Sequence, residues 1–283
     1  MLTAIGSRSA DRLPVWRSLL PRGQYVLLMS GESQATVFTA RRTSFGRTAA
    51  TYDAVRPEWP AKTISWMLGS PPPERSLRVV DLGCGTGKGS RALIALGHEV
   101  EAVDPSAGML GVLEEPRATM PRERSAKLRT HRGNAEQIPL PDGSAEAVTA
   151  LQAWHWFDQD TAARECARVL RPGGWLSMTW HYRDDDSGWG AELSAIVQRH
   201  EHKPDAAELP QTAGPFGAAE TTLFAYVLRQ SVEDLVRHAG TWSFVAVNPD
   251  RDRILAQVRA LGTRVAGDDG MVQIPKRTWC YRL

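Results

Sequence analysis

The chain contains few of the residues that mark disulfide-rich or metal-binding proteins. Among its 283 residues are only three cysteines, Cys84, Cys166 and Cys280, which lie far apart in the sequence. An odd number of widely spaced cysteines predicts neither a disulfide framework nor a metal site, so we expect no bound metal. A reducing compartment suits such a chain, and we therefore predict a cytoplasmic protein.

The chain also lacks a strong net charge and a long apolar run. Lysine and arginine total 34 against 32 aspartates and glutamates, a net charge of +2. This charge is too small to predict nucleic acid or a membrane surface as a partner. No apolar run is long enough to span a bilayer, and Pro21, Arg22 and Gly23 interrupt the N-terminal apolar residues, which disfavours a signal peptide. The composition, 42% hydrophobic and 23% charged, is that of an ordinary soluble globular protein.

Residues 1–44 differ in composition from the rest of the chain. Arginine is frequent there and acids are few, so we expect a basic extension that is disordered. Met29 comes just before the polar segment 30–33 and is an alternative start, which leaves open whether residues 1–28 belong to the natural protein. From Phe45 onward apolar positions recur at regular spacing, and we expect one domain over residues 45–283.

The order of the periodic segments predicts an α/β fold. Strands are expected at 77–82, 99–104, 127–132, 145–152 and 175–182, and helices at 61–68, 87–96, 106–114 and 160–170, the last capped by Asp160 or Thr161. Helices between most strands imply a mostly parallel sheet covered on both faces. Further helices are expected at 191–202, 231–239 and 251–261, and strands at 221–230 and 271–282. We therefore expect a Rossmann-like, doubly wound sheet of seven strands with an antiparallel strand at its edge.

Residues 79–87, Val-Val-Asp-Leu-Gly-Cys-Gly-Thr-Gly, are the most informative segment. They predict a buried strand that breaks into a glycine loop before a helix, where a ligand can approach bare backbone. A phosphate-binding P-loop needs four residues between its first glycine and the Gly-Lys pair, but only three separate Gly83 from Gly87, and Gly89 follows Lys88. The dinucleotide fingerprint would need glycine in place of Lys88. Both kinds of loop are therefore excluded.

The segment resembles instead the first motif of class I methyltransferases that depend on S-adenosylmethionine (AdoMet). The resemblance implies AdoMet as the cofactor; a glycine-rich turn without a ligand is the alternative. By this resemblance the backbone of the loop meets the methionine part of AdoMet, and Asp81 binds its ammonium group or orders the loop. The loop residues concerned are Gly83, Cys84, Gly85 and Gly87. Asp104 ends the next expected strand, and a carboxylate there can accept hydrogen bonds from both ribose hydroxyls, or cap a helix.

Two further segments extend the resemblance. Gly133-Asn134-Ala135-Glu136 resembles the adenine segment of the type 11 subgroup, where Asn134 would bond the adenine amino group and Ala135 and Glu136 would supply backbone. Residues 152–157, Gln-Ala-Trp-His-Trp-Phe, resemble a branch that includes trans-aconitate-like small-molecule methyltransferases, with Gln152 near the cofactor. Residues 45–60 look like the N-terminal cap of the same branch, with Tyr52 and Arg56 facing cofactor or substrate. The similarity covers residues 45–180 well and is only suggestive at Trp242.

His155 follows the fourth expected strand, where an acceptor must approach. Its ordinary pKa suits proton removal near neutrality, so it is a candidate general base; a histidine that only packs or hydrogen-bonds is the alternative. Trp154, Trp156 and Trp242 are candidate walls of the acceptor pocket, although we expect one of Trp154 and Trp156 to belong to the core.

These observations predict an AdoMet-dependent methyltransferase that moves a methyl group to an O, N or C nucleophile of a small molecule. Residues 45–185 would form the cofactor-binding core, and residues 186–283 the acceptor-shaping insertions and last strands. The protein would be a monomer or a homodimer. A methyltransferase acting on a macromolecule and an AdoMet-binding scaffold without activity are the alternatives; the place after strand four lacks the Asp/Asn-Pro-Pro-Tyr turn typical of base methylation.

Overall fold

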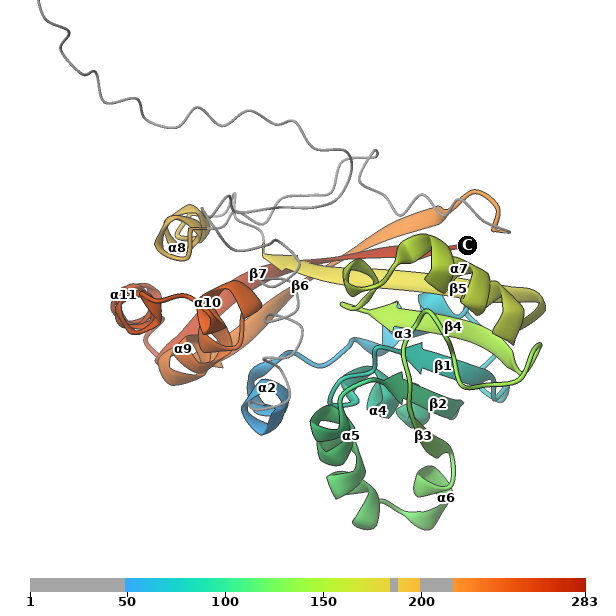
Figure 1. Ribbon diagram of the computed structural model, residues 1–283. Helices are drawn as coiled ribbons and strands as arrows, with labels where there is room; N and C mark the ends of the chain where they lie inside the picture. Colours follow the sequence, from blue (N-terminus) through green and yellow to red (C-terminus); the bar gives the residue numbers. More distant parts are fainter. Residues whose placement is uncertain (1–48, 184–187, 199–215) are drawn as a thin grey trace, which may run out of the picture.

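The computed structural model describes residues 49–183, 188–198 and 216–283 (Figure 1). The basic extension predicted over residues 1–44 and the alternative start at Met29 lie outside these residues. Within them the chain forms a seven-stranded sheet of order β3-β2-β1-β4-β5-β7-β6. The strands are β1 (Arg78–Leu82), β2 (Glu99–Asp104), β3 (Leu128–Arg132), β4 (Ala145–Leu151), β5 (Leu170–Arg183), β6 (Glu220–Ser231) and β7 (Met271–Arg282).

Five strands run parallel and the sheet ends in an antiparallel pair. Strands β3, β2, β1, β4 and β5 pair in parallel, whereas β7 is antiparallel to both β5 and β6. The predicted Rossmann-like, mostly parallel fold is therefore confirmed. Its strand order reverses between β1 and β4, and in such sheets ligands bind outside the carboxyl ends of the strands at that reversal.

Two layers of helices cover the parallel part of the sheet. The neighbouring residues Val79 and Val80 are both fully buried but belong to different core clusters. Val79 packs with α3 (Ala61–Met67) and α4 (Lys88–Ala95), and Val80 packs with α7 (Gln159–Val169). Because successive strand residues point to opposite faces, β1 is buried on both sides, which explains its nearly unbroken apolar run.

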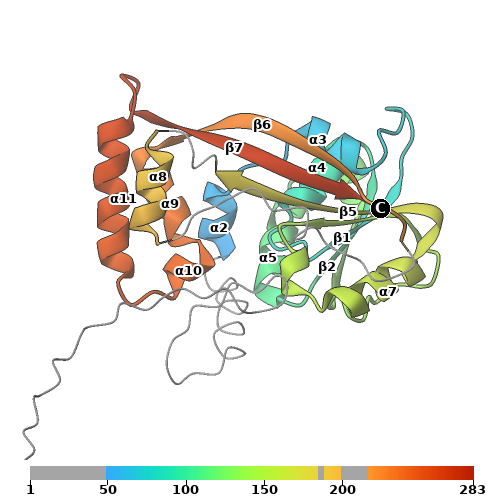
Figure 2. The same cartoon turned by 90° about the horizontal axis from the view of Figure 1, so that it is seen from above.

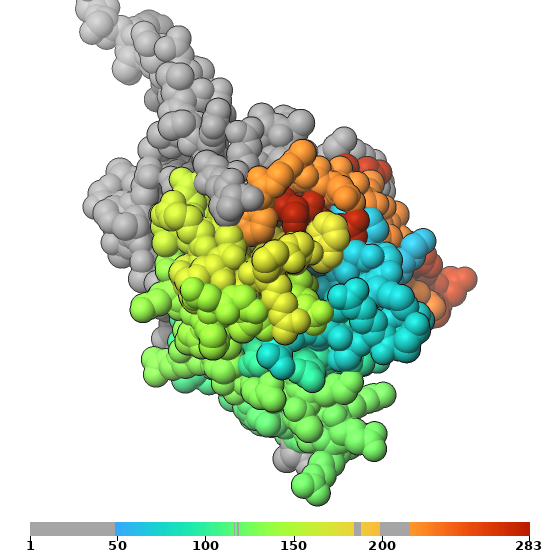
Figure 3. All heavy atoms as spheres, turned by 90° about the vertical axis from the view of Figure 1, so that its right-hand side faces the viewer, coloured from blue at the N-terminus to red at the C-terminus, as the bar shows by residue number. Residues whose placement is uncertain are grey.

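A third core lies beyond the parallel sheet. It joins α8 (Gly190–Ile196), α9 (Val232–Gly240), α10 (Ser243–Ala246) and α11 (Arg251–Val265) to the far ends of β6 and β7. Figure 2 shows the long strands β5, β7 and β6 running from the parallel core to this helical group, with α2 (Ala49–Val55) between the two. Residues of the parallel core, cyan to yellow, and of β6, orange, adjoin in one surface on the face seen in Figure 3.

Several boundaries differ from the prediction. Helix α7 is capped by Asp158, whose side chain accepts a hydrogen bond from Thr161 N, and not by Asp160 or Thr161. The predicted helix 191–202 ends at Ile196, and residues 199–202 lie outside the described part of the chain. After the helix α5 (Ala107–Glu114), residues 115–126 contain two short helical turns that were not among the predicted elements, η2 (Glu115–Ala118) and α6 (Arg122–Ser125). No helix within the described residues could cross a membrane.

Candidate functional site

The glycine loop joins β1 to α4 and turns through left-handed backbone. Gly83, Gly85 and Gly87 have φ values of +68°, +55° and +83°. A Cβ on Gly83 would lie 2.7 Å from the Cβ of Ala153, and one on Gly87 would lie 2.1 Å from Leu113 Cδ1. At Gly85, by contrast, a Cβ would meet nothing within 4 Å among the described residues. The protein itself therefore fills the space at two of these glycines and leaves it open at the third.

Asp104 lies across the loop at the end of β2. Its Oδ2 accepts a hydrogen bond of 2.9 Å from Gly85 N, and its Oδ1 accepts one of 2.8 Å from Ser106 N. Burial raises the pKa of the carboxyl, and these two backbone donors oppose the rise. Each carboxylate oxygen has a further lone pair, so Asp104 can orient the loop and still accept from hydroxyl groups of a ligand.

Asp81 lies inside the protein at the end of β1, only 1% exposed. Its Oδ2 accepts a 2.6 Å hydrogen bond from Ser90 Oγ on α4. Its pKa is raised to about 6, mainly by burial; the nearby Asp104 contributes to the rise, and the bonds from Ser90 oppose it. Of the two roles predicted for Asp81, this buried position favours ordering the loop over a direct contact with a ligand.

The raised pKa of Asp81 predicts a pH-dependent contribution to stability. A carboxyl whose pKa is about 6 in the folded protein and 3.8 unfolded binds its proton more tightly when folded, so it stabilises the protein as the pH falls from 6 to 4. Two pKa units correspond to about 2–3 kcal/mol. We expect the free energy of unfolding, measured with urea, to rise in the wild type relative to Asp81→Asn by about 2 kcal/mol as the pH falls from 6 to 4. Parallel curves for the two proteins would contradict the assignment.

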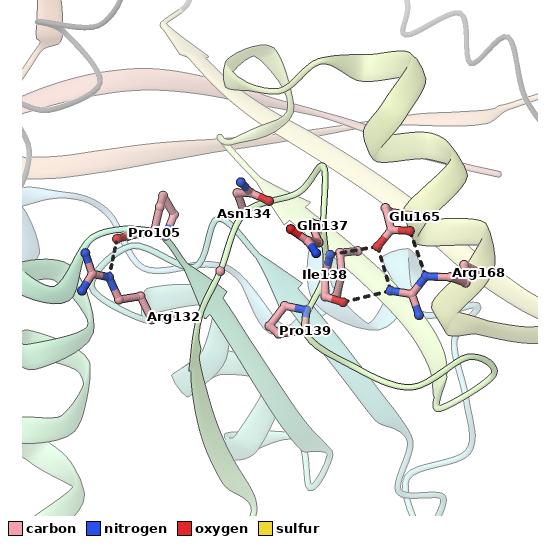
Figure 4. Close-up of a pocket in the computed structure, with 9 residues that line it drawn as sticks. Pro105, Arg132, Asn134, Gln137, Ile138, Pro139, Glu165 and Arg168 are labelled. Atoms are coloured by element: carbon pink, nitrogen blue, oxygen red, sulfur yellow. Dashed lines mark hydrogen bonds and ion pairs between the residues drawn. The ribbon is translucent and has the colours of Figure 1, made fainter.

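The predicted adenine segment follows β3 and borders an open groove of about 710 Å³ (Figure 4). Asn134 is exposed and lines this groove, whereas Ala135 is buried. Glu136 Oε1 accepts a 2.9 Å hydrogen bond from Asp158 N, which ties the segment to the start of α7. The side chain of Asn134 is thus available to a ligand at the carboxyl end of β3.

An ion-pair network on α7 fixes the loop that follows this segment (Figure 4). Arg168 donates to the carbonyl oxygens of Ile138 and Leu140, each at 2.9 Å, and pairs with Glu165 and Asp142. Glu165 in turn accepts from Ile138 N. The Arg168 guanidinium thus supplies hydrogen-bond donors to two carbonyl oxygens of an irregular loop, where no helix or strand provides them.

We expect Arg168→Gln to lower the free energy of unfolding by about 2 kcal/mol, because charged hydrogen bonds to the loop are lost. Arg164→Gln is the matched control, since Arg164 lies one helical turn earlier, is exposed and bonds only to Thr161 Oγ1 among the described contacts. Urea denaturation of the two variants measures the difference. An equal effect of both substitutions would mean that the network adds nothing beyond a surface charge.

The segment after β4 forms a 3-10 turn, η3 (Trp154–Trp156), and is not extended. Trp154 is fully buried in the core and meets Phe157 edge-on at 5.7 Å between ring centroids, whereas Trp156 is half-buried. Trp154 is therefore the member of this pair that belongs to the core, and its predicted place in the acceptor pocket is not supported. Gln152, at φ +58°, donates from Nε2 to the carbonyl oxygen of His181 at 3.1 Å.

His155 is exposed, and its Nδ1 accepts a 3.1 Å hydrogen bond from Trp180 Nε1. An Nδ1 that accepts requires the proton of the neutral ring to be on Nε2. In this arrangement neither nitrogen offers a free lone pair, so the geometry favours the packing or hydrogen-bonding alternative over a general base.

Tyr52 and Arg56, two of the predicted site residues, lie close to the distant segment that contains Trp242. The guanidinium of Arg56 lies 4.7 Å from the centre of the Tyr52 ring and donates to Thr241 Oγ1 and to Thr241 O, each at 3.2 Å. Trp242, next in the chain, is 5% exposed and stacks on Phe244 at 5.8 Å. Tyr52 and Arg56 are thus attached to the C-terminal helices, and Trp242 is mostly covered by protein.

A polar cluster that was not predicted from the sequence lies beside these residues. His181 and Arg183 on β5 share a face of the sheet with Thr278 and Lys276 on β7 and Tyr226 on β6. The alternation of polar residues at 179, 181 and 183 was a signal that they share a face, but the pairing with β7 could not be read from it. No group of three or more metal-ligating side chains occurs within the described ranges.

Comparison with known proteins identifies the family. The family model described as a methyltransferase domain, type 11, matches residues 80–178. A protein of Mycobacterium tuberculosis described as an uncharacterized methyltransferase is 37% identical over 245 residues, which cover 84% of this chain and 94% of that protein. This chain belongs to the AdoMet-dependent methyltransferases. The predicted family and enzyme class are confirmed, whereas no comparison singles out the trans-aconitate-like branch.

Two further similarities bear on this methyltransferase. A solved structure from Anaeromyxobacter dehalogenans, described as a type II methyltransferase, has 24% identity and a TM-score of 0.58, covering 80% of this chain and 97% of that one, and it shows the same fold. A malonyl-[acyl-carrier protein] O-methyltransferase of Methylococcus capsulatus is 38% identical over 143 residues, about half of each chain. The family implies AdoMet binding, and the open space at Gly85 beside the carboxylate of Asp104 fits a ligand of that kind.

Proposed function

We propose that this methyltransferase transfers a methyl group from AdoMet to an oxygen, nitrogen or carbon nucleophile of a small molecule and releases S-adenosylhomocysteine. The observation behind the small acceptor is the covered carboxyl end of β5. Helix α2 is held beside the C-terminal helices by a hydrogen bond from Arg56 to Thr241. A second hydrogen bond, 2.9 Å from Gln230 Nε2 to Val55 O, holds it beside β6. A site enclosed between these elements would suit a small molecule better than a polymer.

For the cofactor we propose the loop from Gly83 to Gly87, including Cys84, with Asp104 and the segment Asn134–Glu136. Bound AdoMet supplies a methyl group on a positively charged sulfur. The loop would hold the methionine part against the open space at Gly85, Asp104 would accept from the ribose, and Asn134 would bond the adenine. Gln152 fixes the neighbouring turn, and Tyr52 and Arg56 lie on the acceptor side. In this arrangement the chain positions two reactants, which can supply much of the rate of a methyl transfer.

A macromolecular acceptor is the second candidate, and one similarity favours it. The relative from Methylococcus capsulatus is named for an acceptor attached to a carrier protein and for methylation at oxygen. The similarity spans only half of each chain, and the net charge of +2 is too small to favour nucleic acid as the acceptor. We therefore place the small-molecule acceptor first and oxygen among its atoms.

Calorimetry followed by a turnover screen tests the proposal. We expect S-adenosylhomocysteine to bind at one site and methylated product to form with at least one member of a panel of small acids, phenols and amines. The product is detected by mass spectrometry. Turnover of a carrier-protein substrate alone would favour the second candidate, and binding without product on any acceptor would favour an AdoMet-binding scaffold.

Within this proposal His155 has a minor role. Because Trp180 already donates to its Nδ1, we expect His155→Ala to lower kcat by less than about tenfold, whereas general bases typically contribute 10²–10⁴-fold. The pH profile of kcat gives a second readout, since removing a general base would eliminate its acidic limb. A loss of more than a hundredfold, with a changed profile, would restore His155 as the base.

A further inference from the structure

One face of the strands β5, β7 and β6 is polar where it leaves the parallel core. His181 lies opposite Thr278 in the antiparallel register, and Arg183 lies opposite Lys276. Tyr226 of β6 lies opposite Lys276 on the far side of β7. Positions two apart on a strand share a face, so these five side chains form one cluster, which we call the β5–β7 polar cluster.

His181 is the centre of this cluster. Its ring stacks on Trp59 at 3.8 Å between centroids and 19° between planes. Its Nδ1 is within hydrogen-bond distance of Thr278 Oγ1 at 2.7 Å and of Tyr226 Oη at 3.3 Å. Its Nε2 is fully buried and has no hydrogen-bond partner among the described residues. A buried polar atom without a partner is costly, and a ligand that bonds it would remove that cost.

Cationic side chains lie near His181. Arg183 and Lys276 are only 4% and 6% exposed, although they face each other across the strands. Arg56 bonds a hydroxyl and a carbonyl oxygen of Thr241, and no carboxylate within the described ranges pairs with it. Burial, together with Lys276 and Arg56, lowers the pKa of His181 well below its ordinary value, so its ring is neutral.

His238 is a second buried histidine whose pKa is lowered by the same cationic side chains. His238 is 2% exposed, and its Nδ1 contacts Gln230 Oε1 at 3.1 Å. Burial lowers its pKa well below the ordinary value, and Arg56, Lys276 and Arg183 lower it further. Of these cations, Arg56 has no carboxylate partner within the described ranges, so it can favour an anion here, where a low dielectric screens charges weakly.

The cluster adjoins the proposed cofactor site. Gln152, at the end of β4, donates to the carbonyl oxygen of His181. Trp59, which covers the His181 ring, belongs to the same core cluster as Cys84 of the glycine loop and Leu151 of β4. The polar cluster is therefore joined to the end of β4 and lies against a core that it shares with the glycine loop.

We infer that the β5–β7 polar cluster, with Arg56 and Trp59, is the acceptor subsite and that the acceptor reacts as an oxyanion, a carboxylate or a phenolate. The inference rests on the proposed function. Arg56 and His181 Nε2 would contact the anion, and Trp59 would pack on its organic part.

This acceptor needs no general base. A lone pair of the anionic oxygen forms the bond to the methyl carbon, the carbon–sulfur bond breaks, and its electron pair stays on sulfur. One negative and one positive charge disappear together, and an ester or an ether and a neutral thioether remain. Arg56 acts earlier, by lowering the pKa of the acceptor so that it is ionised when it binds.

The test compares anions with neutral molecules of the same shape. Protein saturated with S-adenosylhomocysteine is titrated by calorimetry with benzoate against benzamide and, at pH 8, with 4-nitrophenol against 4-nitroanisole. We expect benzoate or ionised nitrophenol to bind at least tenfold more tightly than its neutral counterpart, and the pair that shows the difference identifies the kind of oxyanion. If the members of both pairs bound equally while S-adenosylhomocysteine stayed bound, the anion subsite would be refuted and the proposed function would stand. Failure of S-adenosylhomocysteine to bind would overturn the proposed function first.

Substitutions test whether Arg56 and His181 cause the tighter binding of anions. Arg56→Gln and His181→Asn should each reduce the affinity for the anion at least tenfold, and Arg56→Lys should retain part of it. Arg259→Gln is the matched control, because it removes an equal charge from the exposed pair of Arg259 with Glu233 on α11 and α9. An equal loss in Arg259→Gln would mean that only net charge matters and would overturn the subsite.

Discussion

Replacing Gly85 with valine is expected to abolish detectable AdoMet binding while leaving the protein folded. A Cβ at this position meets no described atom within 4 Å, so the new side chain would occupy the space that we assign to the cofactor. At φ +55° a residue with a Cβ is strained by about 1–2 kcal/mol, less than the stability of a typical domain. Calorimetry with S-adenosylhomocysteine and circular dichroism measure the two effects separately.

Gly87 provides the contrast that makes this prediction specific. It has the same left-handed backbone, but a Cβ there would overlap Leu113 at 2.1 Å. Gly87→Ala should therefore reduce the free energy of unfolding by at least 2 kcal/mol, because both strain and overpacking apply. If Gly85→Val bound S-adenosylhomocysteine with unchanged affinity, the cofactor would lie elsewhere.

Local pattern was enough to predict the parallel half of the fold. The segment 79–87 combines two β-branched residues, an acid and alternating glycines, and each of these requirements is local: a strand, a turn at positive φ, and a helix start. The bounds of β2 and β7 were predicted to the residue. The cap of α7 was misplaced because Asp158 and Asp160 are chemically alike, and only the bond from Thr161 N to Asp158 distinguishes them.

The acceptor side depends on pairings that no local pattern encodes. Arg56 meets Thr241 across 185 positions of sequence, and His181 meets Thr278 across 97. A shift of β7 by one residue would turn Thr278 and Lys276 to the other face, so the cluster exists only in the register that the packing selects. His155 was the more visible histidine in the sequence because it adjoins a motif, although His181 has the more enclosed environment.

Asp104→Ala should weaken the binding of S-adenosylhomocysteine by about 2–6 kcal/mol, a factor of roughly 30 to 3 × 10⁴. Two losses add up in this estimate. The bonds that we propose to the ribose account for about 1–3 kcal/mol, and the charged bond from Gly85 N that holds the loop in shape accounts for a similar amount. Asp104→Asn separates them, because its amide keeps one acceptor oxygen for Gly85 N or Ser106 N but not for both.

The cofactor's own chemistry offers the control for this prediction. Comparing S-adenosylhomocysteine with its 2′-deoxy analogue removes one ribose hydroxyl without changing the protein. If Asp104 binds the ribose, the analogue should bind the wild type about 5- to 150-fold more weakly, the equivalent of about 1–3 kcal/mol, and should bind Asp104→Ala no more weakly than the parent compound does. If Asp104 only shapes the loop, the missing hydroxyl should weaken binding equally in both proteins, because no interaction with residue 104 is lost along with it.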